Sequence, residues 1–134
     1  MSKRGENFRE RVEDLVTLFE GGIDRDEWST RRYPKRLRDD DQFVYEVTSL
    51  YLQKGPTRLL LDPLGDDMLG TEGAADIYQM PAYDPAASLY FEGGRWILHY
   101  ASPTDPAEAQ ALELTAETIN RVLDSIAEHA VPSI

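Results

Sequence analysis

The fold is decided by residues 88–100, SLYFEGGRWILHY. Two runs rich in apolar and aromatic residues flank the pair Gly93-Gly94. Because glycine adopts the positive φ angles of a tight primed turn at little steric cost, this spacing predicts an antiparallel β-hairpin. Side chains alternate along a strand, so Trp96, Leu98 and Tyr100 are expected on one face and His99 on the other.

Three further segments have strand character. Residues 42–52, QFVYEVTSLYL, and 57–61, TRLLL, are joined by a short Lys-Gly-Pro turn, which predicts a second hairpin. Residues 75–80 form a short strand that ends at Pro81. The chain therefore contains about five strands in antiparallel hairpins, and no strand–helix–strand alternation indicates a doubly wound fold.

The two ends of the chain have helical periodicity. Phe8, Val12, Leu15, Val16 and Phe19 recur at helical spacing over about residues 6–20, and Gly21-Gly22 ends that helix. A second helix is predicted from an N-cap at Thr115 to about residue 130. We expect an α+β fold, in which a single antiparallel sheet has the N-terminal and C-terminal helices packed on one face.

The remaining segments are polar. Residues 23–41 are mixed in charge and contain Pro34, which predicts a long surface loop. Residues 101–111 are rich in proline, alanine and acids and predict a linker. We interpret residues 1–134 as one globular domain, because domains typically hold about 100–150 residues.

Composition excludes several classes of protein. The chain has 134 residues and no cysteine, so it has no disulfide scaffold, thiolate nucleophile or Cys-ligated metal. No apolar run approaches the roughly 20 residues that cross a bilayer, and the N-terminus lacks the pattern of a secretory signal. We expect a cytoplasmic protein without a membrane contact. No motif indicates a cofactor.

Charge is distributed unevenly along the chain. The net charge is −11, yet residues 1–58 hold equal numbers of acidic and basic residues. The excess belongs to residues 59–134, where Arg95 and Arg121 are the only Lys or Arg residues. An acidic surface attracts basic partners and repels nucleic acid. A solubilising role is the simpler interpretation of the acidity.

Within the first segment, residues 1–58, the basic residues are concentrated in positions 31–38. The cations are followed at once by Asp39-Asp40-Asp41. Arginine binds phosphate well, so contact with nucleic acid inside a larger complex is one interpretation. Binding of free nucleic acid is disfavoured by the negative remainder of the chain. The simplest interpretation is a flexible loop that folds onto the acids of the chain itself. Of the two binding roles, docking of a partner protein is preferred, through Arg31, Arg32, Tyr33, Lys35, Arg36 and Arg38.

Acidic residues gather between positions 62 and 76. Asp62, Asp66 and Asp67 are candidate ligands for a hard divalent cation, but their spacing does not match a calcium-binding EF-hand loop. We therefore favour a solvated acidic loop without a metal. Asp66, Asp67 and Glu72 are candidate contacts for a basic partner.

Few residues indicate catalysis. Asp84 and His99 are candidates for an acid–base pair, and with Tyr83 they would line a small pocket. Glu46 is a second candidate partner for His99. No serine lies in a Gly-x-Ser-x-Gly elbow, and no glycine-rich phosphate loop is present. The sequence therefore favours a protein that is not an enzyme.

Aromatic residues are concentrated in the predicted strands. A sheet covered by helices on one face leaves its other face open, and tyrosine tolerates half-burial. The candidates for an exposed tyrosine-bearing face are Tyr45, Tyr78, Tyr90 and Tyr100. Such a face would form a binding surface.

In size, low pI and acidity, the chain is similar to type III secretion chaperones and to immunity proteins that neutralise basic nuclease toxins. The resemblance is one of composition, and no residue is carried over from it. We predict a non-enzymatic interaction domain, either an accessory or adaptor subunit or an immunity-type protein. Its partner would be a protein with a basic surface. A homodimer, a small enzyme or ligand-binding domain near Tyr83, and a subunit of a nucleic-acid complex are the alternatives.

Overall fold

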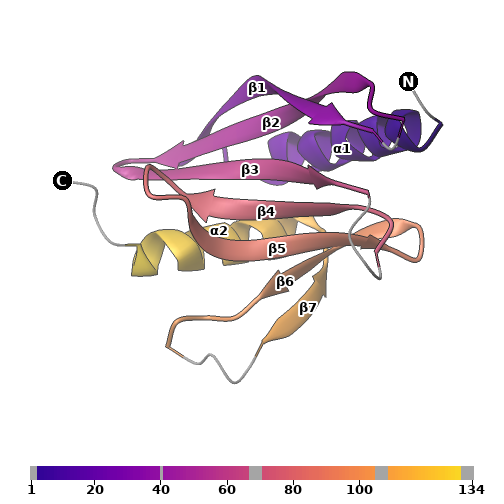
Figure 1. The fold of residues 1–134 in the computed structure, drawn as a ribbon. Coiled ribbons are helices and arrows are strands. Elements are labelled where there is room, and N and C mark those ends of the chain that lie inside the picture. Colours follow the sequence, from indigo (N-terminus) through magenta and orange to yellow (C-terminus); the bar gives the residue numbers. More distant parts are fainter. Residues whose placement is uncertain (1–2, 40, 67–70, 105–108, 131–134) are drawn as a thin grey trace.

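A computed structural model describes residues 3–39, 41–66, 71–104 and 109–130. Within these ranges two helices flank one sheet of seven strands in the order β1 to β7, each antiparallel to its neighbours (Figure 1). The elements are α1 (Lys3–Gly22), β1 (Ser29–Arg38), β2 (Val44–Lys54), β3 (Thr57–Gly65), β4 (Ala74–Gln79), β5 (Asp84–Glu92), β6 (Arg95–Tyr100), β7 (Gln110–Glu113) and α2 (Ala116–His129). The predicted α+β class and single antiparallel sheet are confirmed, but the expected number of strands was too small.

The hairpin predicted from residues 88–100 forms as expected. Gly93 and Gly94 have φ angles of 60° and 82°, which fit a tight turn between β5 and β6. Leu89 pairs with Leu98, and Ser88 pairs with His99. The two faces of β6 are also as predicted, because Trp96 and Leu98 are buried in the core.

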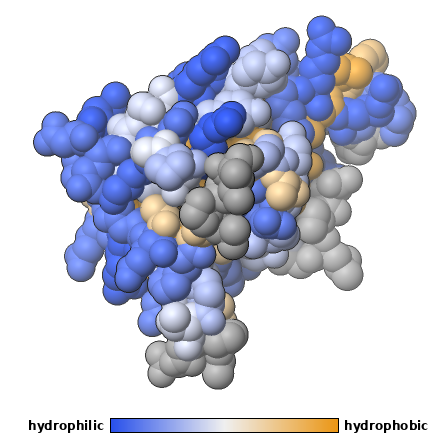
Figure 2. Space-filling model, turned by 90° about the vertical axis from the view of Figure 1, so that its left-hand side faces the viewer, coloured by the Kyte–Doolittle hydropathy of each residue, from blue (hydrophilic) through white to orange (hydrophobic). Residues whose placement is uncertain are grey.

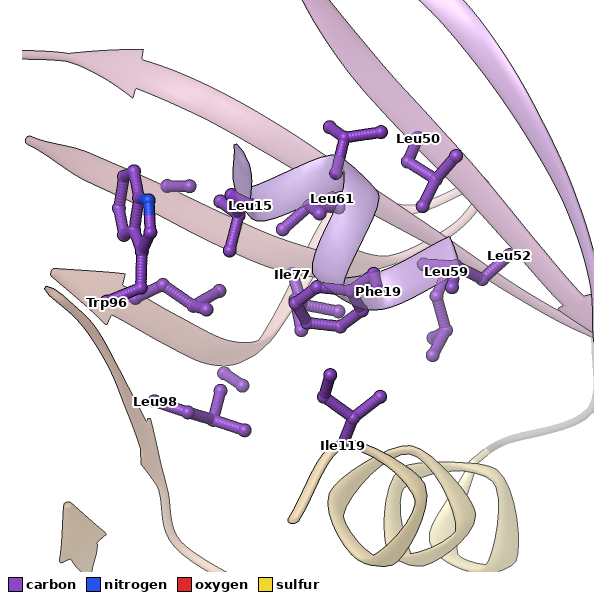
Figure 3. Close-up of a cluster of buried hydrophobic side chains, with 14 of the residues drawn as sticks. Leu15, Phe19, Leu50, Leu52, Leu59, Leu61, Ile77, Trp96, Leu98 and Ile119 are labelled. Carbon is purple, nitrogen blue, oxygen red and sulfur yellow. The ribbon is translucent and has the colours of Figure 1, made fainter. Parts of the chain in front are cut away.

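Both helices cover the same face of the sheet and contribute to one core (Figure 1). Figure 3 shows apolar side chains around a common centre, and those that it labels come from α1, β2, β3, β4, β6 and α2. The labelled residues are Leu15, Phe19, Leu50, Leu52, Leu59, Leu61, Ile77, Trp96, Leu98 and Ile119. Burial of this apolar area is the main source of stability, at about 25 cal/mol for each Å² removed from water.

The ends of the helices follow their sequence signals. In α2 the Thr115 side chain accepts a hydrogen bond from the backbone of Thr118, whose hydroxyl accepts one from the Thr115 backbone. This capping box satisfies two donors at the helix start and confirms the predicted N-cap. Helix α1 ends at Gly22, close to the predicted position, but begins three residues earlier than expected.

The long surface loop predicted for residues 23–41 is wrong in its central part, because residues 29–38 form strand β1. This strand lies at the edge of the sheet and pairs only with β2 in the described residues. An edge strand tolerates proline and charged side chains, since half of its backbone groups need no ladder partner. Pro34 and the basic residues therefore made a strand resemble a loop.

The linker predicted for residues 101–111 is also partly wrong. Residues 105–108 lie outside the described residues, and β7 begins at Gln110. Its partner is β6, with Leu98 opposite Leu112 and His99 opposite Ala111. At four residues, β7 is too short to show a clear alternation in sequence.

Strands β2 and β3 separate along part of their length. Their pairing covers 50–54 of β2 and 57–61 of β3. Among the described residues, 44–49 pair only with β1, and 62–65 pair only with β4. In the region where the two strands separate, two backbone carbonyl groups accept hydrogen bonds from cationic side chains. Arg9 donates to Glu46 O at 3.1 Å, and Lys35 donates to Pro63 O at 2.7 Å.

Candidate binding site on the open face of the sheet

The face of the sheet opposite the helices carries a row of paired side chains. Arg31 on β1 lies opposite Tyr51 on β2, Tyr51 lies opposite Leu60 on β3, and Leu60 lies opposite Tyr78 on β4. Directly paired residues of antiparallel strands share a face. Leu59 and Leu61, the neighbours of Leu60, point into the helical side. The row therefore lies on the face that no helix covers.

Aromatic contacts continue around this row. Tyr33 and Tyr51 meet edge to face with ring centroids 6.0 Å apart, and Tyr78 meets Tyr83 in the same way at 5.9 Å. Tyr33 is 51% exposed and Tyr83 is 57% exposed. Large aromatic side chains at such exposure are suited to contact with another molecule.

The predicted tyrosine face is correct for only two of its four members. Tyr78 and Tyr90 lie on the open face, where Tyr90 packs against His99. Tyr45 is on the same side of β2 as Tyr51, but it is 6% exposed and packs in the core cluster. Tyr100 faces the helices, since its hydroxyl shares a hydrogen bond with Ser125 of α2. The register, which the sequence pattern did not define, decides these directions.

A line of polar groups crosses the middle of the open face. Lys35 donates to Asp62 Oδ1 at 2.8 Å, and Asp62 lies opposite Asp76 in the β3–β4 pair. Asp76 accepts hydrogen bonds from Tyr78 at 2.9 Å and Ser88 at 3.0 Å. Burial, and next the hydrogen bond to Asp76, raises the pKa of the Tyr78 hydroxyl to about 12. These bonds hold the polar line in one arrangement.

A pocket of about 490 Å³ lies at one end of this face. It is bordered by β1, the β2–β3 hairpin and the start of the β4–β5 connection, whose turns lie at the same end of the sheet in Figure 1. Its cationic residues are Arg31 and Arg58. The aromatic, apolar and polar lining includes Tyr33, Tyr51, Met80, Pro81 and Gln53. Seen from this end, the molecule is largely hydrophilic with small separate apolar areas (Figure 2).

The basic residues predicted as one contact are divided between the two sides of β1. Arg31, Tyr33 and Lys35 share one side of β1 and lie opposite Tyr51, Ser49 and Val47, of which Ser49 and Val47 are themselves buried. Arg32 points the other way and binds Glu13 and Glu20 of α1. Arg36 and Arg38 alternate with Lys35 and share the side of Arg32, and Arg38 donates to the backbone of Gln42. The run is therefore not a single basic surface.

The Arg32 ion pairs have a clear electrostatic effect. Arg32 Nη2 lies 2.7 Å from Glu20 Oε1, and Nη1 lies 3.0 Å from Glu13 Oε2. Hydrogen bonding from Arg32 lowers the pKa of Glu20 below its ordinary value of 4.5. The same bonds raise the pKa of Arg32. This cluster attaches the edge strand to α1.

The acidic residues predicted for metal or partner binding are mostly occupied. Asp62 binds Lys35, Asp66 binds Arg4 at 3.1 Å, and Glu72 binds Arg11 at 3.7 Å. Asp67 lies outside the described residues. No group of three or more potential metal ligands is found in the ranges that the structure describes.

The structure does not bring the candidate acid–base pair together. His99 pairs with Ser88, whereas Asp84 pairs with Gln79 at the start of β5. Asp84 and Ser88, the partner of His99, are four residues apart along β5, which corresponds to about 13 Å. Glu46 on β2 is separated from β6 by three strands. The predicted pairing of His99 with Asp84 or Glu46 is therefore wrong.

His99 also lacks the contacts of a catalytic base. Its Nε2 is buried and has no hydrogen-bond partner in the described part of the chain. Ser88, although directly opposite, donates its hydroxyl hydrogen to Asp76. A serine nucleophile needs its base within hydrogen-bond reach, and here that bond goes to a carboxylate on another strand.

Salt bridges join the nearly neutral first segment of the chain to the acidic second segment. Arg4, Arg11, Lys35 and Lys54 lie in the first 58 residues, and each binds an acid from residues 59–134. The acids are Asp66, Glu72, Asp62 and Asp124, respectively. Opposite charges that lie in different segments of the sequence therefore form ion pairs in the fold.

Sequence reasoning missed Arg58, Tyr51 and Gln53 as site residues. They come from the β2–β3 hairpin. Tyr51 and Gln53 pair with Arg31 and Ser29 of β1, and Arg58 pairs with Gln53, which brings all three to the pocket. The sequence predicts this hairpin, but the segment that pairs with the other side of β2 has the sequence pattern of a loop. Without β1, the sequence pattern contained no signal that joined Arg31 to Arg58.

Comparisons with known proteins found no matching family model, no matching curated protein and no matching solved structure. In the described ranges, neither α1 nor α2 is long and apolar enough to cross a membrane. Function is therefore inferred from the open face and its pocket.

Proposed function

We propose that this chain is a non-catalytic protein-binding domain and that its open sheet face is the binding surface. The observation that carries the proposal is the placement of both helices on the other face, so that no helix covers the row from Arg31 to Tyr78, in which Arg31 is exposed and Leu60 is buried (Figure 1). Tyrosine and arginine are enriched in protein interfaces, and interface hot spots often contain them.

The arrangement of the tyrosines also supports this function. Tyr33 and Tyr83 are both more than half exposed, and each is held by an edge-to-face contact with a second tyrosine. A side chain that is already fixed loses little conformational entropy when a partner binds. The two tyrosines therefore form preorganised contacts at two places on the same face.

We place the main contact on the sheet face and not on the acids of the second segment. Asp66 and Glu72 are engaged by α1, which reduces their attraction for a basic partner. The side chains of Asp84 and Glu92 are exposed and have no hydrogen bond or ion pair in the described residues. These two acids would supply the contact with a basic rim on the partner protein.

Co-purification from the native cell tests the proposal. The full-length protein is tagged and captured from a lysate, and the wild type is compared with Tyr33→Ala and Tyr83→Ala. Leu18→Ala is the matched control, because Leu18 is 45% exposed on α1. We expect one partner protein to be lost from both tyrosine variants and retained by the control.

A result in which no protein is enriched by the wild type contradicts the proposal. So does retention of the partner by both tyrosine variants. If the occupant is a second copy of this chain, sedimentation will show a dimer of the wild type that dissociates in the two tyrosine variants.

A further inference from the structure

We propose that the pocket at the end of the open face binds an organic anion, with a carboxylate or phosphate group attached to an apolar body the size of one ring. This inference goes beyond the proposed protein-binding function and does not depend on it. It rests on the charge, the shape and the lining of the pocket.

The two arginines of the pocket are placed by the sheet. Arg31 lies opposite Tyr51, which in turn lies opposite Leu60, and Arg58 is two residues before Leu60 on β3. Both side chains therefore share the open face. Two strand spacings and a two-residue offset put their Cα atoms about 12 Å apart, and long arginine side chains reach over such a span.

These arginines have no counter-charge. In the described residues, neither guanidinium group has an ion pair or a hydrogen bond, whereas Arg32, Lys35 and Lys54 are all ion-paired. None of the residues that line the pocket is acidic, in a chain with 25 Asp and Glu residues. Two unneutralised cations at one pocket favour an anion, and the arginine fork matches carboxylate and phosphate oxygens.

The rest of the lining suits an apolar group. Tyr33 and Tyr51 supply aromatic surface, and Met80 and Pro81 supply apolar surface on the side of β4. A volume of about 490 Å³ lies within the usual range for small-molecule sites of roughly 300–1,000 Å³. The pocket therefore offers cationic groups for an oxyanion and an apolar wall for the body that carries it.

The probes are 3-phenylpropionate and phenyl phosphate, which present the two anions on the same ring. The neutral control probe is 3-phenyl-1-propanol. Each is titrated into the ¹⁵N-labelled full-length protein and followed by heteronuclear NMR. We expect saturable shifts confined to residues 29–33, 51–58 and 80–82 for at least one anion. The tighter of the two anions then identifies the class of ligand.

The variants are Arg31→Gln and Arg58→Gln. Arg36→Gln is the matched control, because Arg36 lies on the same strand, also has no partner in the described residues and points to the other face. Loss of one charge-assisted contact is expected to weaken binding of the anion about tenfold in each pocket variant. Arg36→Gln should bind as the wild type does, and the alcohol should bind about tenfold more weakly than the better anion.

Three results would overturn the proposal. The first is the absence of saturable shifts in the pocket with both anions. The second is equal weakening by Arg36→Gln, which would indicate a general charge effect. The third is undiminished affinity in both pocket variants. Arg31→Lys and Arg58→Lys retain the charge without the fork, so they supply folded variants if the glutamine variants do not fold. They too should bind more weakly than the wild type.

Discussion

Lys35 on the edge strand reaches across β2 to bind Asp62 on β3, with a distance of 2.8 Å from Nζ to Oδ1. The same ammonium group donates to the carbonyl of Pro63 at 2.7 Å. Both bonds lie where β2 and β3 no longer pair. Lys35 therefore supplies a connection that the backbone ladder lacks at this place.

Replacement of Lys35 by methionine should destabilise the fold by about 1–2 kcal/mol. The Lys35 and Asp62 side chains are only 30% and 16% exposed, so removal of the cation leaves a carboxylate and a carbonyl with a desolvation cost. Urea unfolding followed by circular dichroism measures the change. Arg36→Met is the control and should change the free energy of unfolding by less than about 0.5 kcal/mol. Equal changes in the free energy of unfolding for Lys35→Met and Arg36→Met would show that the Lys35 contacts do not stabilise the fold.

Arg32→Gln should reduce stability in a pH-dependent way. Because Arg32 lowers the pKa of Glu20 in the folded state, the resulting stabilisation is complete above the unfolded value of 4.5 and is lost as pH falls through the lower folded value. We expect a deficit of about 1 kcal/mol near pH 7 that narrows below pH 4.5. Unfolding curves at several pH values measure it, and a deficit that does not change with pH contradicts the assignment.

Tyr78 should ionise late in an alkaline titration. Burial and the bond to Asp76 raise its pKa to about 12, whereas free tyrosine ionises near 10. The unfolded chain therefore loses this proton first, and the contribution of Tyr78 to stability falls as pH rises from about 10 through 12. Absorbance at the phenolate band should contain a late component that Tyr78→Phe removes. An unchanged late component in this variant would be the contrary result.

His99→Leu should be tolerated. The substitution removes a buried Nε2 that has no hydrogen-bond partner in the described residues. It also removes the edge-to-face contact with Tyr90, in which the two ring centroids lie 5.1 Å apart. These effects oppose one another, so the free energy of unfolding should change by no more than about 1 kcal/mol. Leu98→Ala, on the helical face, should cost about 2–5 kcal/mol. A loss above about 2 kcal/mol in His99→Leu would contradict this prediction and would indicate a stabilising interaction of the imidazole beyond its contact with Tyr90.

Phe19→Ala should be among the most damaging substitutions in α1. Phe19 is fully buried among residues of the sheet and α2 (Figure 3), and truncation of such a side chain costs about 3–5 kcal/mol. Leu18→Ala, at the neighbouring exposed position, should change stability by less than about 0.5 kcal/mol. Thermal unfolding compares the two variants. Similar midpoints would contradict the packing described for the core.

Elements with strong periodicity were predictable from sequence. The helix ending at Gly22, the N-cap at Thr115 and the turn at Gly93-Gly94 each follow from a local rule, and tertiary contacts did not override it. Strand β1 was not predictable in this way. Its side chains face α1 on one side and the open face on the other, so neither side gives the apolar alternation of a half-buried strand.

The site was less predictable than the fold. Arg31 and Tyr33 were expected to contact a partner, and they line the pocket. Arg58 was not expected to, because a cation in a predicted hairpin has no special meaning until the strand beside it is known. The pairing of Asp84 with His99 failed for the same reason, since proximity on a sheet is set by register and not by sequence distance.

The four salt bridges between residues 1–58 and 59–134 have a consequence for a chain cut at the β2–β3 turn. Cleavage beside Gly55 would give two fragments, one nearly neutral and one strongly acidic, and each would contain the counter-ions of the other. Because one fragment is nearly neutral, net charge gives the two no long-range attraction, and recombination would depend on the local ion pairs that form when they dock. The unequal distribution of charge along the sequence therefore leaves each piece with ionic side chains whose partners lie only on the other piece.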